Sequence, residues 1–156
     1  MKIEINKKAP NFTLPDQDNK KHKLGDYIGS WLLIYFYPKD NTPGCTKEAC
    51  MIRDNFPFFE KLDLKVIGIS ADSVESHKKF IKKHNLPFTL LSDEKKETLE
   101  KYGVLKEKSM FGRSFMGIMR TSFLIDDKGR VVKIYENVKP AIHAEEVLED
   151  VKDMRK

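Results

Sequence analysis

Residues Trp31–Tyr37 form an uninterrupted apolar run that ends at Pro38. A strand with one face in water alternates apolar and polar residues, whereas a strand covered on both faces is apolar throughout. A second, largely apolar run, Leu64–Ser70, occurs further along the chain. We therefore expect two central strands in a sheet that has helices on both faces.

The segments between and after these strands carry helical signals. A helix is expected from Thr42 to at least Phe56, because Thr42 suits the N-cap and Pro43 the first helical position. Pro57 should kink or end this helix, and a second helix is expected over Ser73–His84 with its first residue as the cap. The remaining patterns predict short strands at residues 11–14 and 88–91, a helix at 94–102, an irregular loop at 105–117, a hairpin of strands at 121–125 and 131–135, and a closing helix from about residue 141.

The order of these elements predicts the fold class. Alternating strands and helices imply a parallel core, and the hairpin adds antiparallel strands. The expected architecture is α/β, with a central mixed sheet flanked by helices. A chain of 156 residues is long enough for a full hydrophobic core, so residues 1–156 are expected to form a single domain.

The composition argues against several classes of protein. The formal net charge is +5, but the lysines are scattered among 24 acidic residues, so no nucleic-acid partner is expected. No apolar run approaches the ~20 residues of a membrane-spanning helix. Residues 1–8 lack the apolar core of a secretory signal. We expect no membrane partner and a cytoplasmic location.

The two cysteines, Cys45 and Cys50, lie where the first core strand is followed by a helix. Open α/β sheets place their functional sites at this end of the strands. A thiol in the first turn of a helix lies among unpaired backbone N–H groups at the positive end of the helix dipole, which favours the nucleophilic thiolate. The cysteine spacing and the dispersed histidines do not match a zinc site. No metal is expected, and catalytic or redox-sensing thiols remain.

The spacing of the cysteines also constrains their reaction with each other. Five helical residues turn the chain by ~500° and advance it by ~7.5 Å. The two Cα atoms then lie beyond the ~7 Å limit for a disulfide. Either a Cys45–Cys50 bond does not form, or the first turns of the helix must unwind. The alternative for Cys50 is that it is a small, partly buried apolar residue.

The residues around the cysteines resemble the peroxiredoxins, in particular the bacterioferritin-comigratory-protein or PrxQ group. The peroxiredoxin motif Pro-x-x-x-Thr-x-x-Cys is present as Pro38, Thr42 and Cys45. The distal arginine of the family matches Arg120, which precedes the expected strand at residues 121–125. The likeness extends over nearly the whole chain, and it implies a thioredoxin-like fold and a thiol peroxidase.

The resemblance also implies a role for each matching residue. Cys45 would attack the peroxide and become a sulfenic acid, and Cys50 would resolve it as an intramolecular disulfide. Thr42 and Arg120 would hold the two peroxide oxygens. The implied catalytic residues are Cys45, Cys50, Thr42, Arg120 and Pro38, the last shielding the sulfur from water, and the implied substrate-binding residues are Thr42, Gly44, Cys45 and Arg120.

The resemblance extends to substrates and partners. Hydrogen peroxide and organic hydroperoxides are the expected substrates, and thioredoxin or a similar dithiol protein would reduce the disulfide. No metal, haem, flavin or other cofactor is required because the sulfur itself reacts, and a monomer is expected. Two alternatives are a dithiol–disulfide oxidoreductase, which the four residues between the cysteines disfavour, and a peroxide-sensing protein.

Three polar residues have more than one interpretation. Glu48 and Arg53 lie one or two helical turns beyond Cys45. They either position Arg120 or cap the site, or else they form an ordinary pair on the helix surface. His143 is expected to be structural.

Overall fold

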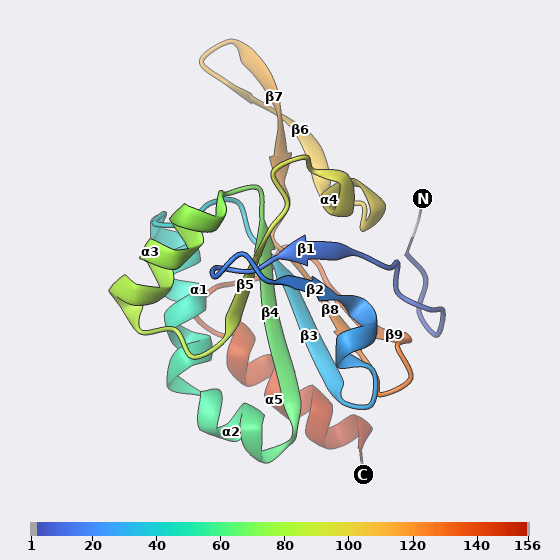
Figure 1. Cartoon of the computed structure of the whole chain (residues 1–156). Helices are drawn as coiled ribbons and strands as arrows, with labels where there is room; N and C mark the ends of the chain where they lie inside the picture. The colour runs from blue at the N-terminus through green and yellow to red at the C-terminus, as the bar shows by residue number, and fades with distance from the viewer. Residues whose placement is uncertain (1–2, 156) are drawn as a thin grey trace.

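The computed structural model describes residues 3–155 and is built on a five-stranded sheet in the order β5–β4–β3–β8–β9 (Figure 1). Three neighbouring strands run parallel: β3 (Trp31–Phe36), β4 (Leu64–Ser70) and β5 (Thr89–Ser92). The other two, β8 (Thr121–Ile125) and β9 (Val131–Tyr135), are antiparallel to their neighbours. The predicted mixed sheet is confirmed.

Helices lie on both faces of this sheet, as predicted. One face carries α1 (Pro43–Asp54), α2 (Phe56–Lys61), α3 (Val74–His84) and α5 (His143–Met154). The other carries α4 (Glu97–Lys101), the 3-10 helix η1 (Leu24–Tyr27) and a small antiparallel sheet of β1 (Thr13–Pro15) and β2 (Lys21–Lys23).

The central strand β3 is apolar throughout because both of its faces are buried. Leu33 and Tyr35 pack into the core on the α1 side, whereas Leu32 and Ile34 pack into the core on the α4 side. Successive side chains of a strand point to opposite faces. Both faces are buried, so both sets must be apolar.

Several boundaries agree with the sequence patterns. β4, β8 and β9 have the predicted limits. α3 ends at His84, and the hydroxyl of Ser73 caps it by accepting from the backbone N–H of Ser76 at 3.1 Å. These elements carry strong local signals: continuous apolar runs for the strands and a capping side chain for the helix.

Other boundaries differ. The helix that starts after Thr42 ends at Asp54, and a separate helix, α2, begins at Phe56 with Pro57 in its first turn. Proline fits a first turn because it needs no hydrogen-bond acceptor there. α4 is shorter than expected because Lys96 adopts a left-handed backbone conformation with φ of 62°. The strands expected at residues 11–14 and 88–91 are displaced by one or two residues, and the closing helix begins at residue 143.

The prediction of an irregular loop at residues 105–117 is wrong. This segment is a β-hairpin of β6 (Leu105–Met110) and β7 (Arg113–Ile118), which projects from the body at the top of Figure 1. Both turn residues, Phe111 and Gly112, have positive φ values of 53° and 77°, as two-residue hairpin turns of this hand require. Phe111 is 97% exposed.

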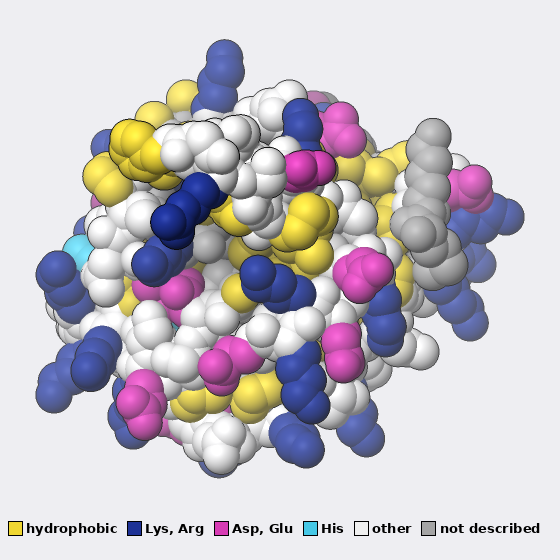
Figure 2. Space-filling model, turned by 90° about the horizontal axis from the view of Figure 1, so that it is seen from above, with side chains coloured by type: hydrophobic (Ala, Val, Ile, Leu, Met, Phe, Trp, Pro, Cys, Tyr) yellow, Lys and Arg dark blue, Asp and Glu magenta, His cyan; other side chains and the backbone are white. Residues whose placement is uncertain are grey.

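Basic and acidic side chains are interspersed on the face that contains this hairpin (Figure 2). The dispersal matches the scattered lysines of the sequence. Within residues 3–155, no helix is long and apolar enough to cross a bilayer.

Candidate active site

The register of the central strands brings the two halves of the predicted site together. Phe36 at the end of β3 pairs with Thr121 at the start of β8. The chain that leaves β3 towards α1 therefore lies beside the chain that enters β8. Cys45 is on the first of these segments and Arg120 on the second, 75 residues away in sequence.

The guanidinium of Arg120 contacts the thiol of Cys45 directly. Its Nη2 lies 3.4 Å from Cys45 Sγ. Cys45 is in the first turn of α1 and is 1% exposed. A cation and the positive end of a helix dipole both stabilise a thiolate, so the arrangement favours a buried nucleophile.

Glu48 holds the other side of the same guanidinium. Arg120 Nη1 donates to Glu48 Oε1 at 2.8 Å, and the Glu48 side chain is 1% exposed. Burial raises the pKa of Glu48 to about 7, although Arg120 opposes this rise. The same ion pair and the nearby sulfur raise the pKa of Arg120, against the effect of its own burial. Glu48 thus orients Arg120 through a buried ion pair.

Arg53 takes no part in this cluster. Its Nε donates to Asp54 at 3.0 Å and its Nη1 donates to the carbonyl of His84 at 2.7 Å. Of the two residues considered for positioning Arg120, the structure brings only Glu48 to it. Arg53 instead ties the end of α1 to the end of α3.

Thr42 occupies the N-cap position of α1 but does not cap it with its hydroxyl. Its backbone is extended, with φ of −86° and ψ of 152°. The hydroxyl donates to the carbonyl of Lys39 at 2.8 Å. Thr42 is therefore the N-cap residue, as expected, but its side chain does not make the capping hydrogen bond. The lone pairs of Thr42 Oγ1 stay available to accept a hydrogen bond.

Gly44 leaves the space in which Arg120 approaches the sulfur. A Cβ at this position would lie 2.9 Å from Arg120 Nη2. Any larger residue here would press on the guanidinium. Pro38 lies two residues beyond the end of β3 and is half-buried.

Cys50 lies further along α1, which is intact through both cysteines. Both thiols are free; Cys45 is buried and Cys50 is half-buried. The helical geometry that separates residues five positions apart therefore applies. The two cysteines therefore lie on one intact helix, as the sequence analysis assumed, and a disulfide between them still requires α1 to unwind.

Two buried polar groups lie behind the site without a hydrogen-bond partner in the described part of the chain: Tyr35 Oη and Glu48 Oε2. Burial raises the pKa of Tyr35 well above its usual value, and the negative charges of Glu48 and Asp40 raise it further. Tyr35 is one residue that the sequence reasoning missed, because it is part of the apolar run of β3.

His143 is fully buried at the start of α5. Its Nε2 lies 2.8 Å from Ser122 Oγ and its ring packs edge-on against Tyr135. Burial lowers the pKa of His143. These contacts join α5 to the sheet, in keeping with the structural role expected for it.

Among the described residues, one group brings metal-ligand atoms together: those of Asp40, Asp72 and His77 lie within 4.8 Å of one another. Hydrogen bonds within the protein already engage these atoms. Asp40 Oδ2 lies 2.8 Å from His77 Nδ1, and Asp72 Oδ2 accepts from the backbone N–H of Asp40 at 2.8 Å. The sequence reasoning missed this network because its members are far apart in the chain.

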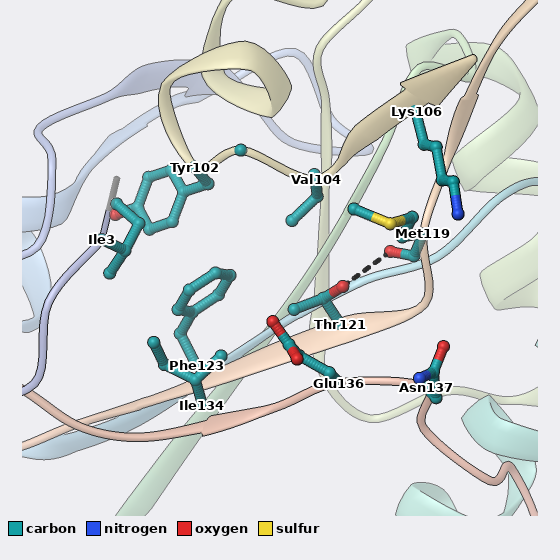
Figure 3. Close-up of a pocket in the computed structure, with 11 residues that line it drawn as sticks. Ile3, Tyr102, Val104, Lys106, Met119, Thr121, Phe123, Ile134, Glu136 and Asn137 are labelled. Atoms are coloured by element: carbon teal, nitrogen blue, oxygen red, sulfur yellow. Dashed lines mark hydrogen bonds between the residues drawn. The ribbon is translucent and has the colours of Figure 1, made fainter. Parts of the chain in front are cut away.

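The predicted site residues do not line the cavity shown in Figure 3. That cavity has a volume of about 610 Å³, and its lining includes Tyr102, Lys106, Met119 and Phe123. Phe123 belongs to the core on the α4 side of the sheet, whereas Cys45 belongs to the core on the α1 side. The cavity and the thiol are therefore on opposite faces.

The sequence matches the AhpC/TSA family over residues 5–134. It is also 49% identical to peroxiredoxin Bcp of Bacillus subtilis over 154 residues, which cover 99% of this chain and 98% of that protein. The chain belongs to the Bcp/PrxQ peroxiredoxins of the AhpC/TSA family. Peroxiredoxin Bcp of Escherichia coli K12 is 45% identical, with 93% of each chain covered.

Solved structures of peroxiredoxins agree with the fold. A crystal structure of Xylella fastidiosa PrxQ superposes with a TM-score of 0.93 at 37% identity, covering 99% of this chain and 98% of that one. A structure of the Xanthomonas campestris bacterioferritin comigratory protein, described in connection with its alkyl peroxide reduction activity, gives a TM-score of 0.88 at 39% identity and covers 93% and 92%. The thioredoxin-like peroxiredoxin fold implied by the resemblance is confirmed.

Proposed function

We propose that this peroxiredoxin reduces hydrogen peroxide and organic hydroperoxides through reversible oxidation of Cys45. The observation that carries the proposal is the contact of 3.4 Å between Arg120 Nη2 and Cys45 Sγ. A fixed cationic donor beside a buried thiol suits attack on an O–O bond, because negative charge moves from sulfur to the departing oxygen. The alkyl peroxide reduction described for the Xanthomonas relative supports the same chemistry.

The first step is peroxide binding and attack. Thr42 Oγ1, whose own proton is donated to the Lys39 carbonyl, accepts a hydrogen bond from the peroxide O–H, while Arg120 donates to the peroxide oxygens. The Cys45 thiolate forms an S–O bond as the O–O bond breaks. The attacked oxygen stays on Cys45 with its hydrogen as a sulfenic acid, and the departing oxygen takes up a proton from solvent and leaves as water or an alcohol. Gly44 leaves room for Arg120, and Pro38 limits access of water.

The second step is resolution by Cys50. Its thiol attacks the sulfenic sulfur, an S–S bond forms, and the hydroxyl leaves as water. Because the two residues are five positions apart on one helix, the first turns of α1 must open. Opening takes Cys45, Glu48 and Ala49 out of the core, where all three are buried. Helix opening is thus part of every cycle.

The third step returns both thiols. A dithiol protein, thioredoxin or a similar one, transfers two electrons and two protons by thiol–disulfide exchange. No metal or organic cofactor takes part in the proposed cycle. We also propose that the chain acts as a single domain and a monomer in the cytoplasm, where reductants return oxidised thiols to the reduced state.

Peroxide consumption tests this proposal. The reduced protein is mixed with hydrogen peroxide, thioredoxin, thioredoxin reductase and NADPH, and NADPH oxidation is followed. Wild type should turn over many times, and Cys45→Ser not at all. Turnover by Cys45→Ser, or none by wild type with either thioredoxin or dithiothreitol, would contradict the proposal. Reduction of insulin without peroxide would instead favour a general dithiol oxidoreductase.

A further inference from the structure

The loop that joins β3 to α1 carries a buried carboxylate, Asp40, which is 4% exposed. Three side chains donate or share a hydrogen with it. Tyr37 Oη lies 2.6 Å from Asp40 Oδ1, and Ser76 Oγ and His77 Nδ1 each lie 2.8 Å from Oδ2. A buried carboxylate with this many donors is fixed in place.

His77 is fully buried and has an acceptor at each ring nitrogen. Its Nε2 lies 3.0 Å from the carbonyl oxygen of Leu91. A carbonyl only accepts, so Nε2 carries a hydrogen. A second hydrogen lies between Nδ1 and Asp40 Oδ2, and the pair therefore has a single, well-defined geometry.

The network joins the loop to the ends of two further strands and to α3. The backbone N–H of Asp40 donates to Asp72 Oδ2 at 2.8 Å, and Ser70 at the end of β4 donates to the same oxygen at 2.7 Å. Leu91 is in β5, and His77 is in α3. The Asp40 side chain is thus held by α3, its backbone N–H by Asp72 beyond the end of β4, and His77 in turn by β5.

The position of Asp40 determines the direction of the Thr42 hydroxyl. Lys39, whose carbonyl accepts from Thr42 Oγ1 at 2.8 Å, is bonded directly to Asp40. The intervening Asn41 has a φ of 63°, a left-handed conformation that asparagine adopts more readily than most non-glycine residues. Fixing Asp40 therefore fixes the Lys39 carbonyl, and through it the acceptor lone pairs of Thr42.

We infer that Asp40 and His77 are positioning residues for the peroxide site: they hold the loop so that Thr42 accepts a hydrogen bond from the peroxide next to Cys45. The inference rests on the proposed function, because these residues would position the groups that bind the peroxide in the first step of that function. Neither residue touches the substrate. Their effect is on the rate of the first oxidation and not on the reactivity of the sulfur itself.

Two rates measured on the same variants test this inference. His77→Asn removes the ring that hydrogen-bonds Asp40 Oδ2. The rate of Cys45 oxidation by hydrogen peroxide should fall about tenfold or more, since small displacements of positioned groups cost up to about a hundredfold. Alkylation of Cys45 by iodoacetamide needs no Thr42 and should change less than about threefold. His84→Asn, a half-buried histidine in the same helix, should change neither rate.

Equal losses in both rates would show a general structural defect and overturn the inference, as would an unchanged oxidation rate. If His77→Asn does not fold by circular dichroism, Tyr37→Phe and Ser76→Ala replace it. Each removes one donor to Asp40 and should slow oxidation but not alkylation. The wild-type oxidation rate tests the proposed function separately, because the inference depends only on the ratio of variant to wild type.

A double-mutant comparison tests the path through Thr42. In a Thr42→Val background, the His77→Asn substitution should cause little further loss of oxidation rate, because the group it positions is already gone. Losses that multiply would mean that His77 acts independently of Thr42. That result would overturn the proposed route.

Discussion

Glu48 makes the stability of this protein depend on pH in a way that can be worked out from the structure. Burial raises its pKa from 4.5 to about 7 in the folded state. The folded protein thus binds this proton more tightly than the unfolded chain does. The stabilisation is fully present below about pH 4.5 and is lost as the pH rises through about 7. The difference amounts to roughly 3 kcal/mol, at about 1.36 kcal/mol for each pH unit.

Glu48→Gln removes this pH dependence while keeping an oxygen that accepts from Arg120. The free energy of unfolding of the variant minus that of wild type should therefore increase between about pH 5 and about pH 8, by up to ~3 kcal/mol. Urea unfolding of the reduced proteins, followed by fluorescence of the single tryptophan, Trp31, measures it at each pH. Glu60→Gln, at an exposed position in α2, should follow wild type.

A difference that stays constant with pH would refute the reasoning, since it would mean that Glu48 has the same pKa folded and unfolded. A difference that decreases with rising pH would mean that Arg120 holds the pKa of Glu48 below its usual value. The ion pair at 2.8 Å would then outweigh burial. Either result would also change the expected state of Glu48 at neutral pH.

Three further predictions concern the site. Arg120→Met should slow the first oxidation by about a hundredfold, as loss of one preorganised donor does. Circular dichroism should show that the variant is folded. An unchanged stopped-flow oxidation rate would mean that Arg120 takes no part in the mechanism. Gly44→Ala should also slow oxidation, about tenfold, because the new Cβ displaces Arg120 Nη2, while circular dichroism should show that the fold is kept; an unchanged oxidation rate would mean that Arg120 keeps its place beside the sulfur. Cys50→Ser should be oxidised once, fail to recycle with thioredoxin and over-oxidise to the sulfinic acid, as mass spectrometry would show; normal recycling would exclude a resolving role.

The fold was predictable from the sequence where local signals coincide with burial. The apolar runs of β3 and β4 and the Ser73 cap of α3 needed no tertiary information. The β6–β7 hairpin was missed because most of its residues are exposed on both faces, so it shows no alternation of buried and exposed side chains. Its Phe111–Gly112 turn also lacks the asparagine or aspartate that signals such turns.

The site was predictable only in part, and for a different reason. The spacing of Cys45 and Cys50 is local, and it carried the expectation that a disulfide between them requires α1 to open. The contact between Cys45 and Arg120 is not local, and only the resemblance to a family supplied it. Asp40 and His77 are 37 residues apart, and each has an ordinary interpretation, as a loop carboxylate and as an inward residue of a helix. No pattern within one segment brings them together.

Intact mass after one equivalent of hydrogen peroxide tests the central claim most directly. The fully reduced protein is treated without added thiol, and its free thiols are counted by alkylation. We expect a loss of about two mass units with both thiols gone and no dimer, which means that Cys45 and Cys50 are joined and that α1 has opened. A gain of one oxygen with a thiol remaining, or a disulfide-linked dimer, would contradict the account, because Cys50 would then not resolve Cys45 within the chain.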